Sequence, residues 1–196
     1  MNWDYRCPFA RNAHEHLVAA LADGADADWD VTFLPFSLSQ VHVPEGGIAV
    51  WDDPDKASDL IALASGVVVR DQYPDQFLDA HIALFAARHD LGLDLRVPDV
   101  VAGVLDGVGL PGNKVVAEAQ SGEPVAAIQA AHEQAVSEWD AFGVPTFVIG
   151  DRAVFVRLMS RPGDDAALAR RTIDGVLALF ETLPDLNEFK HTSLSH

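Results

Sequence analysis

The feature that most constrains the fold is a long run of helical signals from Asp53 to Phe142 with strand signals on both sides. Within it, "PGNK" at residues 111–114 interrupts the pattern, and a short helix to Gln120 follows. Proline is tolerated in the first turn of a helix, so helix starts are predicted at Asp-Pro or proline positions. These starts are Asp53-Pro54 (to about Arg70), Pro74 (to the Gly92 stop), Pro98 and Pro124 (to Trp139).

The flanking segments carry strand and helix signals in an order that defines a mixed α/β arrangement. "WDVTFLPFSL" is apolar on both faces, which favours an inner strand, and "GVPTFVIGDRAVFV" places Gly150-Asp151 between two apolar runs, as in a hairpin. The predicted order is β-α-β, helices, β-β-α. The elements are a strand at 1–5, a helix at 8–21 ended by a Gly/Ala/Asp loop, a strand at 29–38, the hairpin at 143–156, and a helix capped by Asp164 and Asp165 and ending near Pro184.

Composition and charge exclude several classes of function. The 196 residues, 49% of them hydrophobic, suffice for one sizeable domain or a small domain with an insertion, and no apolar run approaches the roughly 20 residues of a membrane span. The formal charge of −17 disfavours nucleic acid and anionic membranes as partners. Because the first residues also lack a basic start followed by an apolar segment, we expect a cytoplasmic protein.

The single cysteine, Cys7, lies directly before Pro8 at the predicted start of a helix. Free N–H groups and the positive end of the helix dipole stabilise a thiolate at such a position, so the sequence predicts a lowered Cys7 pKa, with Arg6 and Arg11 as further positive charges. A cysteine that merely packs as a small hydrophobic residue is the simpler alternative. One cysteine cannot form an intramolecular disulfide, so any redox partner is another molecule.

A second motif, "GVPT" at residues 143–146, lies between a helix and an apolar strand. A proline that opens a strand in this way is a candidate for a cis peptide bond, although only about 5–6% of X-Pro bonds in folded proteins are cis. Together with the Cys-Pro helix start, the motif makes Cys7 a candidate nucleophile.

These two motifs and their order resemble the DsbA-like branch of the thioredoxin superfamily, and within it the FrnE-like proteins and mycothiol-dependent reductases. The supporting stretches are "DYRCPFA", "FLPFSL", "FGVPTFVIGDRAVF" and "LPDLNEFKHT". The resemblance implies an α/β fold with a thioredoxin-like mixed sheet. Residues 1–52 and 143–196 would form the core, and residues 53–142 a large all-helical insertion domain.

The resemblance also implies roles for individual residues. Cys7 would be the catalytic nucleophile, and Val144 and Pro145 would offer a backbone edge on which a substrate or thiol docks like an added strand. Phe9 would supply an apolar wall. The full set expected to bind the thiol or substrate is Pro8, Phe9, Arg11, Val144, Pro145 and Thr146.

Two departures from the family pattern shape the expected chemistry. Ala10 stands where a dithiol member has its resolving cysteine, so a monothiol cycle is expected, in which a small thiol such as mycothiol or glutathione resolves a mixed disulfide on Cys7. The substrate would be a small electrophile or disulfide, with no tightly bound cofactor and no metal. The first strand is short, and the apolar edge that this exposes favours a homodimer.

Two other interpretations remain open. Kappa-class glutathione transferases and chromene-carboxylate isomerases share this fold and use one serine where the cysteine stands, without redox cycling. Alternatively, the chain is a degenerate thioredoxin-fold module that binds a partner without catalysis, and its Cys7 pKa would then lie near the ordinary value of about 8.5.

The remaining polar residues give weaker signals. His14 and His16 are two residues apart on a helix, so they do not form the i, i+4 pair of a helical zinc site. His81 and His132 lie in the helical block and are candidate proton donors, whereas His42, His89 and the strand-end Ser37 are expected to be ordinary surface or turn residues. Hydrolase, P-loop and Rossmann motifs are missing from the sequence.

Overall fold

The computed structural model describes residues 1–22 and 28–191. Single 3₁₀ turns at Pro54–Lys56 and Pro74–Gln76 precede the third and fourth helices. The helices are α1 (Pro8–Ala22), α2 (Leu38–Val41), α3 (Ala57–Gln72), α4 (Phe77–His89), α5 (Pro98–Gly107), α6 (Gly112–Ala119), α7 (Glu123–Trp139) and α8 (Ala166–Thr182), and the strands are β1 (Asn2–Trp3), β2 (Leu34–Pro35), β3 (Thr146–Ile149) and β4 (Arg152–Phe155).

The helices follow the predicted capping signals closely. Asp53 accepts a hydrogen bond from the backbone N–H of Asp55 before α3, and Asp165 accepts one from the N–H of Leu168 at the start of α8. The prediction that 111–114 breaks the helical pattern was wrong in part, because α6 begins at Gly112 inside that stretch. The short helix α2 was also missed. The loop predicted after α1 lies largely outside the described residues.

The strands are much shorter than predicted. Strand β1 pairs in parallel with β2 over two residues on each strand, and β3 pairs with β4 in the predicted antiparallel hairpin. The strand predicted at 29–38 shrinks to Leu34–Pro35, the two residues that pair with Asn2 and Trp3 of β1. The expected mixed sheet is thus two small strand pairs in the described residues.

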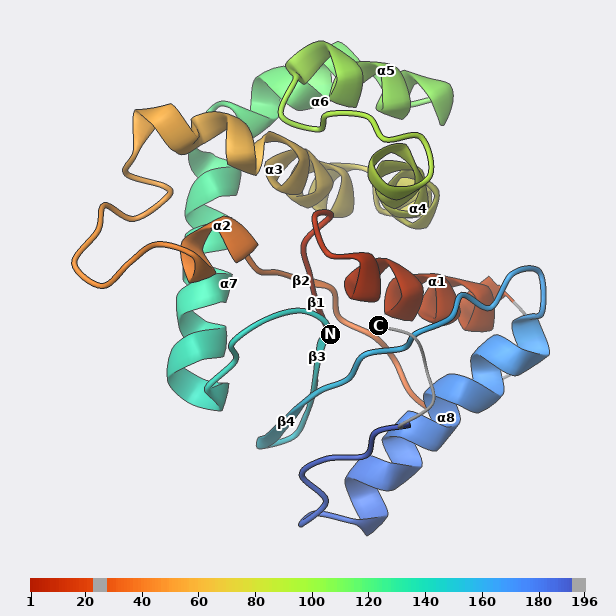
Figure 1. Ribbon diagram of the computed structural model, residues 1–196. Coiled ribbons are helices and arrows are strands. Elements are labelled where there is room, and N and C mark those ends of the chain that lie inside the picture. Colours follow the sequence, from red (N-terminus) through yellow and green to blue (C-terminus); the bar gives the residue numbers. More distant parts are fainter. Residues whose placement is uncertain (23–27, 192–196) are drawn as a thin grey trace.

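The helices surround these strands on both sides (Figure 1). Helix α8 packs along α1, and α7 packs beside β2 on the other side of the strands. Helices α3 to α6 gather at one end of the molecule, above α1, and occur in the chain between β2 and β3. This order agrees with a helical insertion in a thioredoxin-like fold, while the proposed domain boundaries stay a prediction.

One hydrophobic core joins the N-terminal residues to the helical block. Trp3, Phe36 and Phe85 are fully buried in it. Helix α3 approaches Tyr5 closely at Gly66, where an added Cβ would lie 2.5 Å from the Tyr5 hydroxyl oxygen. None of the helices in the described ranges combines the length and apolar character that crossing a membrane requires.

Candidate functional site

The predicted nucleophile, Cys7, is held at the start of α1 by a tight loop. Its backbone N–H donates to Asp4 O at 3.1 Å. The Asp4 carboxylate accepts from the backbone N–H groups of Arg6 (2.9 Å) and Leu38 (2.8 Å), so it ties this loop to the start of α2. The first residues and the segment after β2 therefore fix the position of Cys7 together.

The second motif contacts the cysteine. The Val144-Pro145 peptide bond is cis, as the sequence predicted. The Cys7 thiol donates to the Val144 carbonyl oxygen at 3.2 Å, and Sγ lies 3.4 Å from the backbone nitrogen of Ala10. Residues 137 positions apart in the sequence thus form one site.

The structure contradicts the predicted low pKa of Cys7. Burial raises the pKa of the thiol above its ordinary value, and the buried carboxylate of Asp4 adds to this effect. Hydrogen bonds from the N–H groups of Ala10 and Phe9, together with the positive charge of Arg157, act in the opposite direction but are outweighed. The helix start is present as predicted, but the cysteine at it is only 8% exposed and has lost most of its hydration.

The two arginines expected to assist the thiol are directed elsewhere. Arg6 is exposed and contacts Ser39 and Asp59. Arg11 binds Asp90 at 2.5 Å and lies 3.8 Å from Glu15, so its predicted role in binding a thiol stays a prediction. The two positive charges were expected near the thiol because Arg6 and Arg11 are close to Cys7 in the sequence. Closeness in the sequence does not determine where a side chain points.

The remaining predicted binding residues differ in their exposure and in their contacts. Pro8 is exposed, and Phe9 is half-buried with the guanidinium of Arg157 5.3 Å from its ring centre. Thr146 is buried, and its hydroxyl donates to Gly143 O at 2.8 Å. Their roles toward a thiol stay predictions.

Three residues near the site carried no signal in the sequence. Asp4 and Arg157 act on the charge state of Cys7, as described above. Asn2 is 2% exposed and bonds the residues on both sides of Val144-Pro145. Asp4 is close to Cys7 in the chain, whereas folding brings Asn2 to the Val144-Pro145 loop and places Arg157, which follows β4, near the thiol.

His14 and His81 form a buried chain of hydrogen bonds with Tyr5. Asn2 O can only accept, so the Nε2–H of His14 donates to it (3.1 Å). Nδ1 of His14 then accepts from Nε2–H of His81 (2.9 Å), whose Nδ1 accepts from the Tyr5 hydroxyl (2.9 Å). Burial lowers the pKa of His14 to about 3 and that of His81 well below its ordinary value. Both nitrogens of His81 are thus occupied within the core, and the candidate proton donor is not free to serve a substrate.

The other candidate polar residues have structural contacts. His132 packs against Phe36 and is also buried, which lowers its pKa to about 4. Ser37 accepts from the backbone N–H of Gln40 and so caps α2.

Three further histidines bond to backbone oxygens. His16 bonds to Asn12 O, the exposed His42 to Leu38 O, and His89, whose pKa is lowered by burial, to Tyr5 O. In the described part of the chain, no three His, Cys, Asp or Glu side chains are grouped to hold a metal ion.

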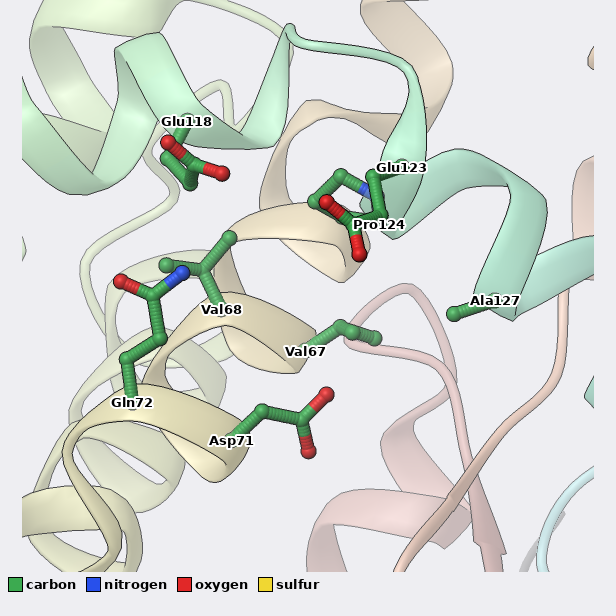
Figure 2. Close-up of a pocket in the computed structure, with 8 residues that line it drawn as sticks. All are labelled: Val67, Val68, Asp71, Gln72, Glu118, Glu123, Pro124 and Ala127. Atoms are coloured by element: carbon green, nitrogen blue, oxygen red, sulfur yellow. The ribbon is translucent and has the colours of Figure 1, made fainter.

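Two surface pockets lie away from the cysteine. Figure 2 shows one of about 160 Å³, formed by α3, α6 and α7, with the carboxylates of Asp71, Glu118 and Glu123 around it. The other, of about 420 Å³, lies between residues 28–34, β3 and α8. Neither is lined by Cys7 or Pro145.

Comparisons with known proteins identify the fold and the family. A comparison with curated protein sequences gives no significant match. The structure is similar to that of DsbA from Pseudomonas aeruginosa (20% identity, TM-score 0.55, covering 92% of this chain and 84% of that one). It is also similar to the oxidoreductase DsbA from Xylella fastidiosa (22% identity, TM-score 0.56, 91% and 83% covered).

These structural similarities show that the chain has a DsbA-like fold, as its resemblance predicted. The family profile of the DSBA-like thioredoxin domain matches residues 3–160, a range that contains both motifs of the site. The chain therefore belongs to the family of DSBA-like thioredoxin domains.

Proposed function

We propose that the chain is a thiol-dependent oxidoreductase that works through Cys7 alone. The observation that carries the proposal is the position of Sγ, at the start of α1 and 3.2 Å from the carbonyl oxygen of Val144. Ala10, one helical turn away, is fully buried and offers no second sulfur. This geometry supports a thiol that reacts with an external molecule docked against the Val144 backbone.

The proposed cycle is two successive thiol-disulfide exchanges. The Cys7 thiolate attacks one sulfur of a small disulfide; a Cys7–S–S–R bond forms, the substrate S–S bond breaks, and the other half leaves as a thiolate. A second small thiol then attacks the mixed disulfide at the sulfur of R, which releases the Cys7 thiolate and a new external disulfide. Mycothiol or glutathione in the cytoplasm is the proposed thiol, as in the FrnE-like and mycothiol-dependent members that the sequence resembles.

The raised pKa of Cys7 limits this cycle at neutral pH. A thiol with a raised pKa is mostly protonated at pH 7, but its small thiolate fraction is intrinsically more nucleophilic. Docking of a substrate against Val144 would replace the thiol's own hydrogen bond to that carbonyl and free the sulfur for attack.

The burial of Cys7 favours a second candidate, a thioredoxin-fold module that binds a partner without catalysis. In that case Cys7 would be a packed hydrophobic residue, and its hydrogen bond to Val144 O would only stabilise the loop.

Mass spectrometry after incubation with glutathione disulfide, and separately with mycothiol disulfide, tests the proposal. We expect a covalent adduct on Cys7 that disappears on addition of the reduced thiol, and neither adduct nor reductase activity in Cys7→Ser. Full activity of Cys7→Ser would refute the proposal. Binding of glutathione without an adduct would instead indicate a transferase or isomerase of the kappa type, and neither binding nor an adduct would indicate the non-catalytic module.

A further inference from the structure

The side chain of Asn2 holds both ends of the loop that contains Val144 and Pro145. Its Nδ2 donates to Gly143 O at 3.2 Å, and its Oδ1 accepts from the backbone N–H of Thr146 at 2.7 Å. A carbonyl oxygen can only accept and an N–H can only donate, so these partners fix the orientation of the amide. Asn2 thus bridges the residues immediately before and after Val144-Pro145.

The bridge replaces backbone bonds that a longer sheet would supply. Strand β1 has two residues and pairs through its backbone with β2, and no ladder between β1 and β3 is present in the described residues. On the opposite edge, Pro145 O accepts from the N–H of Val156 at 3.1 Å. The loop is therefore held on one side by Val156, the residue after β4, and on the other by the amide of Asn2.

Two further contacts make the bridge rigid. The backbone carbonyl of Asn2 accepts from His14, which joins it to the buried histidine chain. The hydroxyl of Thr146 donates to the same Gly143 oxygen that accepts from Asn2. Asn2 is 2% exposed, so water does not compete for these bonds.

We propose that Asn2 is a positioning residue that sets the Val144 backbone edge against Cys7, and so controls how a disulfide or thiol docks for exchange. The proposal rests on the proposed function. Asn2 acts through Gly143 and Thr146 and does not touch the reacting sulfur. Loss of its amide would let the edge move away from Cys7 while leaving the thiol itself in place.

The test compares exchange with alkylation in Asn2→Leu, which keeps the branching at Cγ but removes both bonds, and in Asn2→Ala. We expect the rate of exchange with glutathione disulfide to fall about tenfold relative to the rate of alkylation by iodoacetamide, because exchange requires docking and alkylation requires only the thiolate. Asp165→Ala, which removes the cap of α8, is the control for a general loss of stability and should leave this ratio unchanged. An unchanged ratio in both Asn2 variants, or the same change in Asp165→Ala, would overturn the proposal.

Amide hydrogen exchange of the wild-type chain provides a test that needs no reaction at Cys7. The Thr146 N–H should exchange at least a hundredfold more slowly than that of Gly150 in the exposed hairpin turn. Equal rates would overturn the positioning role even if the variants fail to fold. If the wild type forms no mixed disulfide but its Thr146 N–H is protected, the proposed function has failed and the bridge itself stands.

Discussion

Acidification from pH 7 to pH 5 should destabilise this protein through the buried chain formed by Tyr5, His81 and His14. Both histidines are fully buried. Because His14 must donate to a backbone carbonyl, its other ring nitrogen accepts from His81 when both rings are neutral. An added proton would place a charge in the core and would disrupt the bond between the two rings. The folded state therefore resists protonation that the unfolded state accepts.

The size of the effect follows from the two pKa values of His14. Its ordinary pKa of about 6.5 applies to the unfolded chain, and burial lowers the value to about 3 in the folded chain. Between these values the unfolded state binds more protons, so stability is complete above pH 6.5 and is lost as the pH falls toward 3. From pH 7 to pH 5 the free energy of unfolding should fall by about 2 kcal/mol from His14 alone, and His81 acts in the same direction.

Urea denaturation at pH 7, 6 and 5, followed by far-UV circular dichroism, measures this loss. Comparison with His14→Gln removes the contributions of the many acidic groups, because these are common to both proteins. We expect the variant to be less stable at pH 7 but to lose about 2 kcal/mol less than the wild type by pH 5. Phe33→Leu removes an aromatic ring whose centre lies 5.6 Å from that of His14, without removing a titratable group. The stability of this variant should differ from that of the wild type by the same amount at each pH. The same pH dependence in wild type and His14→Gln would refute the reasoning.

Three further predictions concern Cys7 and the helical block. The alkylation rate of Cys7 with iodoacetamide should rise about tenfold per pH unit from 7 to 9 without a plateau, because burial raises the pKa of the thiol; a plateau below pH 8 would contradict this. Arg157→Gln should slow alkylation at pH 8 about two- to fivefold, a modest change because Arg157 is exposed; an unchanged rate would show that its charge does not act on the thiol. Gly112→Ala should reduce the free energy of unfolding in urea by about 3 kcal/mol, because the new Cβ would lie 2.0 Å from the backbone oxygen of Ala102. Gly103→Ala, where the new Cβ meets open space, should instead stabilise α5 by about 0.5–1 kcal/mol. Equal effects of the two substitutions would show that the close contact at Gly112 is not maintained.

The sequence predicted the helices better than the strands, for a physical reason. Helix signals are local: Asp165 and the prolines at helix starts mark boundaries through contacts within one turn. Strand length depends on the partner. Residues 29–33 have a strand-like pattern, but β1 is too short to pair with them.

The candidate site shows the same division between local and distant effects. Pro8 marked the helix start at Cys7, and the position of Pro145 before an apolar strand predicted the second motif. The sign of the Cys7 pKa shift could not be predicted, because it depends on burial under distant segments and on the carboxylate of Asp4. Asn2 carried no signal because its partners lie more than 140 positions away.

The buried Ala10 beside Cys7 has a consequence for how the redox state of such a protein is set. A dithiol site can release two electrons by closing its own disulfide and regain them when that disulfide is reduced, so its ring-closure equilibrium determines its potential. A site with one sulfur has no such internal store. Under the cycle proposed above, its oxidised fraction at equilibrium would follow the ratio of disulfide to thiol in the surrounding solution.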